Sequence, residues 1–219
     1  DGHKRCSLFG RQIRFNLEES FPLMTHKKVF VRGAFEELMW MLRGQTDNQI
    51  LKEKNVHIWD LWEGQIDPSK PTELGKIYGD LWRNFGIVEH KNGFKFQEGF
   101  DQIEWVKNEI KTNPTSSRML VSGWNPQVST NTPKEAVLPC CHVLYQFFVE
   151  DGKLSCQLYQ RSGDFVIGNC LNIVFDSLLT HLMAQQCDLE VGEFIITFGD
   201  VHLYSDQLEM AKEILTRPI

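Results

Sequence analysis

LPCCHVLYQFFVEDGKLSCQLYQRSGD, residues 138–164, contains the strongest local structural signal in the chain. Aromatic and β-branched residues are abundant in 143–149 and 154–159, and the pair Asp151-Gly152 lies between these two runs. Both positions of such a two-residue turn need a positive φ, which aspartate tolerates and glycine favours. The stretch therefore predicts a β-hairpin.

The turn also predicts which residues face each other across the hairpin. Pairing outward from the turn places Cys141 opposite Ser162, with Gln160 and Asp164 as diagonal neighbours on the same face. A thiol among polar groups suits a reactive cysteine, because the thiolate needs donors or positive charge nearby to form at neutral pH. Strand alternation turns His142 to the opposite face, which disfavours a simple Cys-His dyad. Taken alone, the hairpin favours the simpler interpretation that Cys141 and the preceding cysteine are small buried apolar side chains.

The composition is that of one globular domain in a reducing compartment. With 219 residues, 42% of them apolar and 24% charged, the chain can bury a substantial core. The net charge of −6 argues against a general nucleic-acid binder, so no DNA binding is expected. Six cysteines without regular spacing, no signal peptide and no long apolar run predict a cytoplasmic protein that does not associate with membranes. The cysteine pair and His142 lack a second CxxC or HxxxH pair, so no metal is expected.

Helix and strand signals are mixed along the chain. Hydrophobic periodicity predicts three helices, at 33–43, 99–114 and 172–187. Residues 117–124 are strand-like. Residues 64–76 have the composition of a loop, and Ser205 is a candidate N-cap for a last helix. The absence of a strict βαβ rhythm favours an α+β fold.

Glu37 is an unusual residue within the first of these helices. Its helical neighbours are all uncharged, namely Gly33, Ala34, Trp40 and Met41. Glu36, by contrast, has Arg32 four residues earlier as a candidate ion-pair partner. A carboxylate placed like Glu37 costs several kcal/mol or so unless it is hydrogen-bonded, metal-bound or catalytic. Two interpretations are equally open: a buried polar residue satisfied by backbone or water, and a general acid or base with a raised pKa.

Segments throughout the chain, in the same order, resemble the thymidylate synthase family. They include "SLFGRQIRFNL" (7–17), "FPLMTHKK" (21–28), "EELMWMLRG" (36–44), "NVHIWDLW" (55–62), "YGDLWRNFG" (78–86), "SRMLVSGWNP" (117–126), the hairpin above and "LLTHLMAQQCDLEVGEFIITFGDVHLYSDQ" (178–207). A match over so many ordered segments is far more specific than one short motif. The resemblance implies one catalytic domain over residues 1–219, an α+β fold with a large mixed β-sheet flanked by helices, and a homodimer in which the two sheets pack together.

The resemblance also implies the site residues. Cys141, the cysteine directly before the histidine, would be the nucleophile, and Cys140 stands where the family usually has proline. Glu37 falls on the catalytic glutamate, which decides between the two interpretations above, and Tyr78 and Asp164 match residues that support proton removal and folate binding. The positions that match dUMP contacts are Arg118, Gln160, Arg161, Ser162, Asn172, His202 and Tyr204. The positions that match folate contacts are Trp59, Trp62, Asp164 and Gly168.

The reaction that the resemblance implies is one-carbon transfer from 5,10-methylenetetrahydrofolate, a co-substrate, to C5 of dUMP, without a metal. Addition of Cys141 to C6 would make C5 nucleophilic, and Glu37 with Tyr78 would manage the protons. Hydride transfer would then give dTMP and dihydrofolate, whereas water addition would give a hydroxymethyl group. Asn172 favours uracil, because an amide can both donate and accept at the uracil edge; the cytosine-using relatives have aspartate there.

Several departures from the family pattern keep alternatives open. Ser117 replaces one of two paired arginines, which leaves Arg118 to reach the partner subunit's site. Unusual residues also stand at Asn169, Cys170, Leu171 and Asp176. The family's N-terminal phosphate-loop arginine and its C-terminal tail would fall outside the sequence as given. The alternatives are a dUMP hydroxymethylase and a catalytically weak nucleotide-binding homologue. A cysteine hydrolase is the least favoured, because His142 is expected to face away from Cys141.

Overall fold

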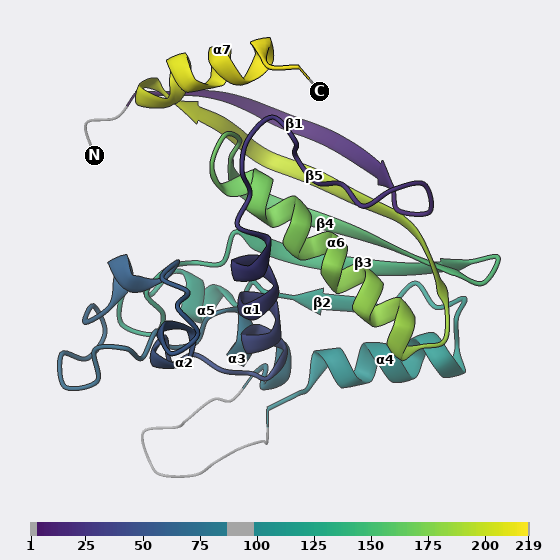
Figure 1. The fold of residues 1–219 in the computed structure, drawn as a ribbon. Helices are drawn as coiled ribbons and strands as arrows, with labels where there is room; N and C mark the ends of the chain where they lie inside the picture. Colours follow the sequence, from purple (N-terminus) through teal and green to yellow (C-terminus); the bar gives the residue numbers. More distant parts are fainter. Residues whose placement is uncertain (1–3, 87–98, 219) are drawn as a thin grey trace.

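The computed structural model describes residues 4–86 and 99–218, and its centre is a five-stranded mixed sheet (Figure 1). The strands are β1 (Arg5–Asn16), β2 (Leu120–Ser122), β3 (His142–Glu150), β4 (Lys153–Asp164) and β5 (Glu190–Tyr204). Their order across the sheet is β1-β5-β4-β3-β2. The β4–β5 pair is parallel and the other three pairs are antiparallel. The single-domain α+β fold expected from the sequence is confirmed.

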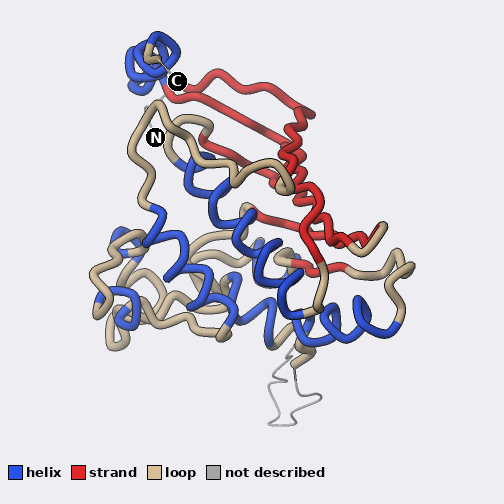
Figure 2. Tube along the Cα trace, turned by 45° about the vertical axis from the view of Figure 1, so that its right-hand side comes forward, coloured by secondary structure: helices blue, strands red, loops and turns tan. Residues whose placement is uncertain are grey.

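The described residues also form helices, and most of these lie on one face of the sheet (Figure 1). The helices are α1 (Val31–Leu42), α2 (Gln49–Lys52), α3 (Tyr78–Arg83), α4 (Gln102–Thr112), α5 (Pro126–Ser129), α6 (Gly168–Gln186) and α7 (Leu208–Thr216), with short 3-10 turns η1 (Asp60–Trp62) and η2 (Ser205–Gln207). Helix α6 connects the parallel strands β4 and β5 and packs against both, as a parallel pair requires. Helix α1 lies against α6, and both helices lie on the same side of the sheet in Figures 1 and 2.

The core lies between α1, α6 and the inner face of the sheet. Its largest fully buried side chains include Trp40, Trp82, Tyr145, Phe147 and Phe194. In the described part of the chain, no helix covers the opposite face of the sheet in Figure 2. That face carries Phe148, which is 57% exposed.

The predicted hairpin is confirmed, but its predicted register fails at the open end. Asp151 and Gly152 have φ values of 49° and 76°, and the expected pairing holds from Glu150–Lys153 to Leu144–Tyr159. A register shift between His142 and Leu144 then pairs His142 with Gln160. The backbone N–H of Arg161 donates to the Cys141 carbonyl at 2.9 Å, so the predicted pairing of Cys141 with Ser162 is wrong. An irregularity of this kind depends on packing at the strand end and not on the turn.

The helix predictions were correct in kind and less accurate in their boundaries. The predicted helices at 33–43, 99–114 and 172–187 are α1, α4 and α6, and α6 begins earlier than expected, at Gly168. Ser205 opens the short turn η2 instead of capping α7, so the predicted N-cap is wrong. The predicted Arg32–Glu36 pair is also wrong: Arg32 donates to backbone carbonyls of Lys54 and Asn55, and Glu36 pairs with the Lys54 ammonium. Arg32 and Glu36 therefore bind residues 54 and 55, which follow α2, and do not bind each other.

Candidate active site

A cavity of about 420 Å³ opens between α1, α3, the hairpin end, the start of α6 and the end of β5. Every residue predicted for the site lines this cavity except Arg118 and Arg161. Sequence reasoning did not identify Met41, Leu138 and Phe175, which form apolar parts of the cavity wall. Apolar residues at helix and strand ends give no signal that separates a cavity wall from a core, so only the fold reveals them.

The Cys141 thiol lies beside a fixed cation. Arg161 Nη2 lies 3.7 Å from Cys141 Sγ, and the same guanidinium donates to the carbonyls of Cys140 at 2.9 Å and Pro139 at 2.7 Å. Burial raises the pKa of the Cys141 thiol, and the positive charge of Arg161 acts in the opposite direction. The Cys140 thiol is more deeply buried, and burial raises its pKa to about 12. Of the two adjacent thiols, Cys141 is therefore the one that lines the cavity with a cation beside its sulfur.

Glu37 places a carboxyl group in the same cavity. It is only 8% exposed, and the indole N–H of Trp59 donates to its Oε1 at 2.7 Å. Burial raises the pKa of Glu37 from 4.5 to about 7, against the smaller opposing effect of the Trp59 hydrogen bond. Near neutral pH the carboxyl group can therefore either give or take a proton, as a general acid or base requires.

The sequence model of thymidylate synthase matches residues 1–219, the whole chain. The chain belongs to the thymidylate synthase family. Members of this family carry out folate-dependent one-carbon transfer to dUMP, and the family implies methylenetetrahydrofolate as co-substrate. One cavity therefore brings together a cysteine thiol and a carboxyl group whose pKa burial raises to about 7.

Tyr78 connects the nucleophile candidate to the aromatic wall. Its hydroxyl accepts a hydrogen bond from the Cys141 backbone N–H at 2.8 Å. Burial raises the pKa of Tyr78 well above its usual value, so the phenol keeps its proton. The Trp59 ring lies next to both Tyr78 and Trp62, with ring centroids 6.3 Å and 5.4 Å apart. These rings form one wall of the cavity.

Asp164 holds the backbone just before α6 through hydrogen bonds. Its Oδ1 accepts from the backbone N–H groups of Val166 and Ile167, each at 3.1 Å, and Gln207 donates to its Oδ2 at 2.8 Å. The carboxyl group thereby connects the end of β4 to the residues just before α6 and to η2. At the end of β5, His202 Nδ1 lies 3.0 Å from Asp200 Oδ1, and the His202 ring meets the edge of Tyr204.

His142 was predicted to face away from Cys141, and that prediction is wrong. Both residues line the cavity, because the register shift after His142 turns its ring inward. The ring lies between Tyr78 and Phe175 and is 7% exposed. Burial lowers the pKa of His142 to about 4, against an opposing hydrogen-bond interaction with Asn172. His142 is therefore neutral at physiological pH.

Two predicted residues lie outside the cavity. Arg161 lies behind the Cys141 thiol with its guanidinium over the Trp124 ring. Arg118 is exposed just before β2 at the sheet edge. Within residues 4–86 and 99–218, no cluster of three histidine, cysteine, aspartate or glutamate side chains could hold a metal ion. Across the same residues, no helix has both the length and the hydropathy needed to cross a membrane.

Glu37→Gln is expected to make the protein more stable in mild alkali. The folded-state pKa of Glu37 is raised, so its contribution to stability is complete below pH 4.5 and is lost as pH rises to about 7. The shift corresponds to about 3 kcal/mol in the free energy of unfolding. Urea unfolding at about pH 4 and about pH 8 measures this difference. The variant should match the wild type at the lower pH and exceed it at the higher; equal pH dependence in both proteins would contradict the buried, raised pKa.

Proposed function

We propose that this thymidylate synthase family protein converts dUMP and 5,10-methylenetetrahydrofolate to dTMP and dihydrofolate. The observation that carries the proposal is the shared cavity of Cys141, flanked by the Arg161 cation, and Glu37, whose pKa is about 7. Nucleophilic addition needs the first group, and proton transfer at the pyrimidine needs the second.

In the proposed reaction, the Cys141 thiolate adds to C6 of the pyrimidine and forms an S–C6 bond. The electron pair moves through C5 towards O4, where Glu37 supplies a proton through water. C5 then attacks the folate methylene carbon, the bond from this carbon to N10 of the folate breaks, and the O4 proton returns through water to Glu37. Removal of the C5 proton by a base breaks the bond from the methylene carbon to N5, which releases tetrahydrofolate and leaves an exocyclic methylene group on C5. Hydride transfer from tetrahydrofolate to this methylene group, with departure of the Cys141 thiolate, gives the methyl product and dihydrofolate.

Nucleotide and folate recognition are assigned to the remaining cavity residues. Asn172 reads the uracil edge, since its amide offers one donor and one acceptor to O4 and N3–H. His202 and Tyr204 take the ribose hydroxyl, Ser162 and Gln160 face the nucleotide, and Arg161 stands behind the thiol as the nearest guanidinium. Trp59, Trp62, Gly168 and Asp164 form the folate side. The structure places all of these except Arg161 around one cavity, which supports the assignment.

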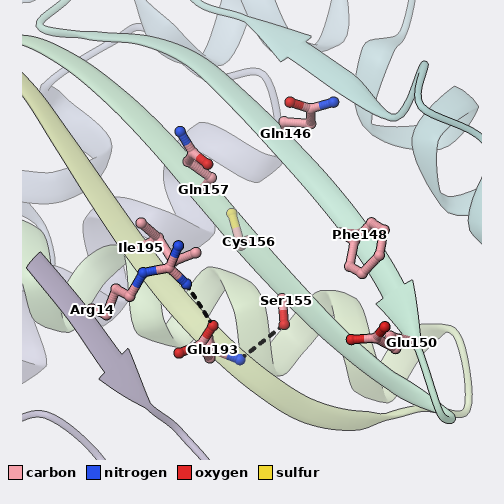
Figure 3. A pocket seen from close by; sticks show the side chains of 9 residues that line it. All are labelled: Arg14, Gln146, Phe148, Glu150, Ser155, Cys156, Gln157, Glu193 and Ile195. Atoms are coloured by element: carbon pink, nitrogen blue, oxygen red, sulfur yellow. Dashed lines mark hydrogen bonds and ion pairs between the residues drawn. The ribbon is translucent and has the colours of Figure 1, made fainter. Parts of the chain in front are cut away.

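The open face of the sheet supports a homodimer. A groove of about 360 Å³ crosses β1, β3, β4 and β5 on this face, with Phe148 and Ile195 among its lining residues (Figure 3). Arg14 and Glu193 form an ion pair of 2.9 Å across β1 and β5. Packing of a second copy here would cover the exposed Phe148 ring, and Arg118 at the sheet edge would then reach the partner's site. A cytoplasmic location fits the six free cysteines.

The hydroxymethyl alternative rests on the unusual residues at the start of α6. Asn169 and Cys170 line a second, largely apolar cavity of about 360 Å³ beside β1 and residues 20–24, not the cavity that holds Cys141. Asn169 contacts the site only indirectly, through a 3.1 Å hydrogen bond from Gln160 Nε2. The methyl product is therefore the better supported of the two.

Product analysis tests the proposal. The protein is incubated with dUMP and 5,10-methylenetetrahydrofolate, and nucleotide and folate products are separated and identified by mass spectrometry. We expect dTMP and dihydrofolate in equal amounts, and neither when folate is omitted. Hydroxymethyl-dUMP with tetrahydrofolate would establish the hydroxymethylase instead. Tight dUMP binding without turnover would favour the nucleotide-binding homologue.

A further inference from the structure

Asn169, the second residue of α6, binds a residue of the active-site cavity without lining that cavity itself. Gln160 of β4 does line the cavity, and its Nε2 donates to Asn169 Oδ1 at 3.1 Å and to the Ser162 carbonyl at 2.9 Å. Both amide side chains are buried, with Gln160 and Asn169 each 1% exposed. The hydrogen bond between them therefore joins the wall of the active-site cavity to the first turn of α6.

The Ser162 carbonyl sets the orientation of both amides. A backbone carbonyl oxygen can only accept, so the Gln160 atom that lies 2.9 Å from it is the NH₂ nitrogen. The same nitrogen contacts Asn169, which must therefore present its Oδ1 atom. These two acceptors use both N–H groups of Gln160. Its Oε1 atom is left over, and it has no hydrogen-bond partner among residues 4–86 and 99–218.

Gly163 leaves the space that the two amides occupy. A Cβ atom at residue 163 would lie 2.8 Å from Asn169 Oδ1, 2.9 Å from Asn169 Nδ2 and 3.1 Å from Gln160 Nε2. These distances are shorter than favourable van der Waals contacts, so any larger residue would push the amides away from their present positions. Glycine at this position and asparagine at 169 therefore form one arrangement around Gln160.

Stability alone does not explain a buried asparagine at position 169. Its Oδ1 atom accepts one hydrogen bond, but its Nδ2 atom is buried and has no partner in the described part of the chain. A buried donor without a partner costs more free energy than one typical hydrogen bond contributes. The benefit of Asn169 is therefore sought in what it does to Gln160.

A fixed amide oxygen on Gln160 suits the nucleoside part of a nucleotide. In dUMP, N3–H and the 3′-hydroxyl can donate, whereas the phosphate dianion and the carbonyl oxygens only accept. A ligand in the cavity that Gln160 lines can supply the donor that Oε1 lacks, directly or through a bridging water. The opposite orientation of the amide would place NH₂ against those donors.

We propose that Asn169 is a positioning residue for nucleotide binding: with Gly163, it holds the Gln160 amide in the orientation in which Oε1 accepts from the nucleoside. The proposal rests on the proposed function, because that function places dUMP in this cavity. It extends that function by giving a role to a residue outside the cavity.

The dissociation constant for dUMP tests this inference, measured by isothermal titration calorimetry without folate. Asn169→Leu removes the acceptor, and Gly163→Ala disturbs the same hydrogen bond with both partners still present. Cys170→Ala is the matched control: Cys170 is also buried, but its thiol donates to the Val166 carbonyl and not to Gln160. We expect Kd to rise about five- to tenfold in the first two variants and to stay unchanged in the control.

A double-mutant cycle with Gln160→Ala separates positioning from a general structural effect. If Asn169 acts through Gln160, Asn169→Leu should raise Kd no further once Gln160→Ala is present. Additive effects of the two substitutions, or a wild-type Kd in both Asn169→Leu and Gly163→Ala, would overturn the inference.

Absence of dUMP binding in the wild type would defeat the proposed function instead. The side-chain amide signals of Gln160, recorded by ¹⁵N NMR of the substrate-free protein, would then decide whether Asn169 holds this amide. Signals that shift in Asn169→Leu and Gly163→Ala but not in Cys170→Ala would support that role, and signals unchanged in all three variants would overturn it.

Discussion

Replacing Cys141 with serine is expected to lower kcat for dTMP formation by at least about 10⁴-fold, as loss of a covalent nucleophile does in other enzymes. The thiolate is the reactive form, and Arg161 lies 3.7 Å from its sulfur to favour that form. A serine hydroxyl at the same place has no comparable tendency to ionise. Steady-state turnover of dUMP with saturating methylenetetrahydrofolate measures the effect.

Cys140→Ala is the matched control for this prediction. Cys140 is the adjacent thiol, but it is 2% exposed, does not line the cavity, and has a pKa raised to about 12 by burial. The substitution removes a small buried group, so we expect some loss of stability and turnover close to that of the wild type per folded molecule. Loss of turnover in Cys140→Ala, or its retention in Cys141→Ser, would contradict the assignment of the nucleophile.

Glu37→Gln is expected to lower kcat by about 10² to 10⁴-fold, the usual contribution of a general acid or base. The amide keeps the shape of the side chain and can still accept from the Trp59 indole, but it cannot exchange a proton with the pyrimidine. The pH–rate profile of the wild type should contain a limb with an apparent pKa of about 7, the value that burial gives Glu37. That limb should be absent in the variant.

Glu36→Gln provides the comparison on the same helix. Glu36 points away from the cavity and pairs with Lys54. Its loss removes an ion pair of the kind that contributes about 0 to 1 kcal/mol, and it should leave both kcat and the pH profile unchanged. A wild-type profile without a limb near pH 7, or equal effects of the two substitutions, would refute the role of Glu37.

Local signals in the sequence predicted the parts of the fold that depend on short-range chemistry. The Asp151-Gly152 turn fixed the hairpin, and helical periodicity located α1, α4 and α6. Strand β1, by contrast, pairs only with β5 at the far end of the chain, so periodicity alone did not indicate their partnership. Pairing over such a distance depends on the whole fold, and the sequence analysis did not predict it.

Some features of the site could also be predicted from local sequence signals, whereas others depend on the fold. Glu37 could be recognised as unusual because its helical neighbours are uncharged, and the resemblance then gave it a role. The interaction between His142 and Tyr145 could not be foreseen, since residues three apart in a regular strand point to opposite faces. The register shift between His142 and Leu144 adds the irregularity that brings both side chains to one face, where Asp176 of α6 meets them.

The most direct test of covalent catalysis is mass spectrometry of the protein after incubation with 5-fluoro-dUMP and 5,10-methylenetetrahydrofolate. Fluorine replaces the C5 proton that must leave, so the proposed reaction should stop with nucleotide and folate both attached to the protein. The account predicts a covalent ternary adduct on the peptide that contains Cys141, present in Cys140→Ala and absent in Cys141→Ser. No adduct in the wild type, or an adduct that persists in Cys141→Ser, would contradict it.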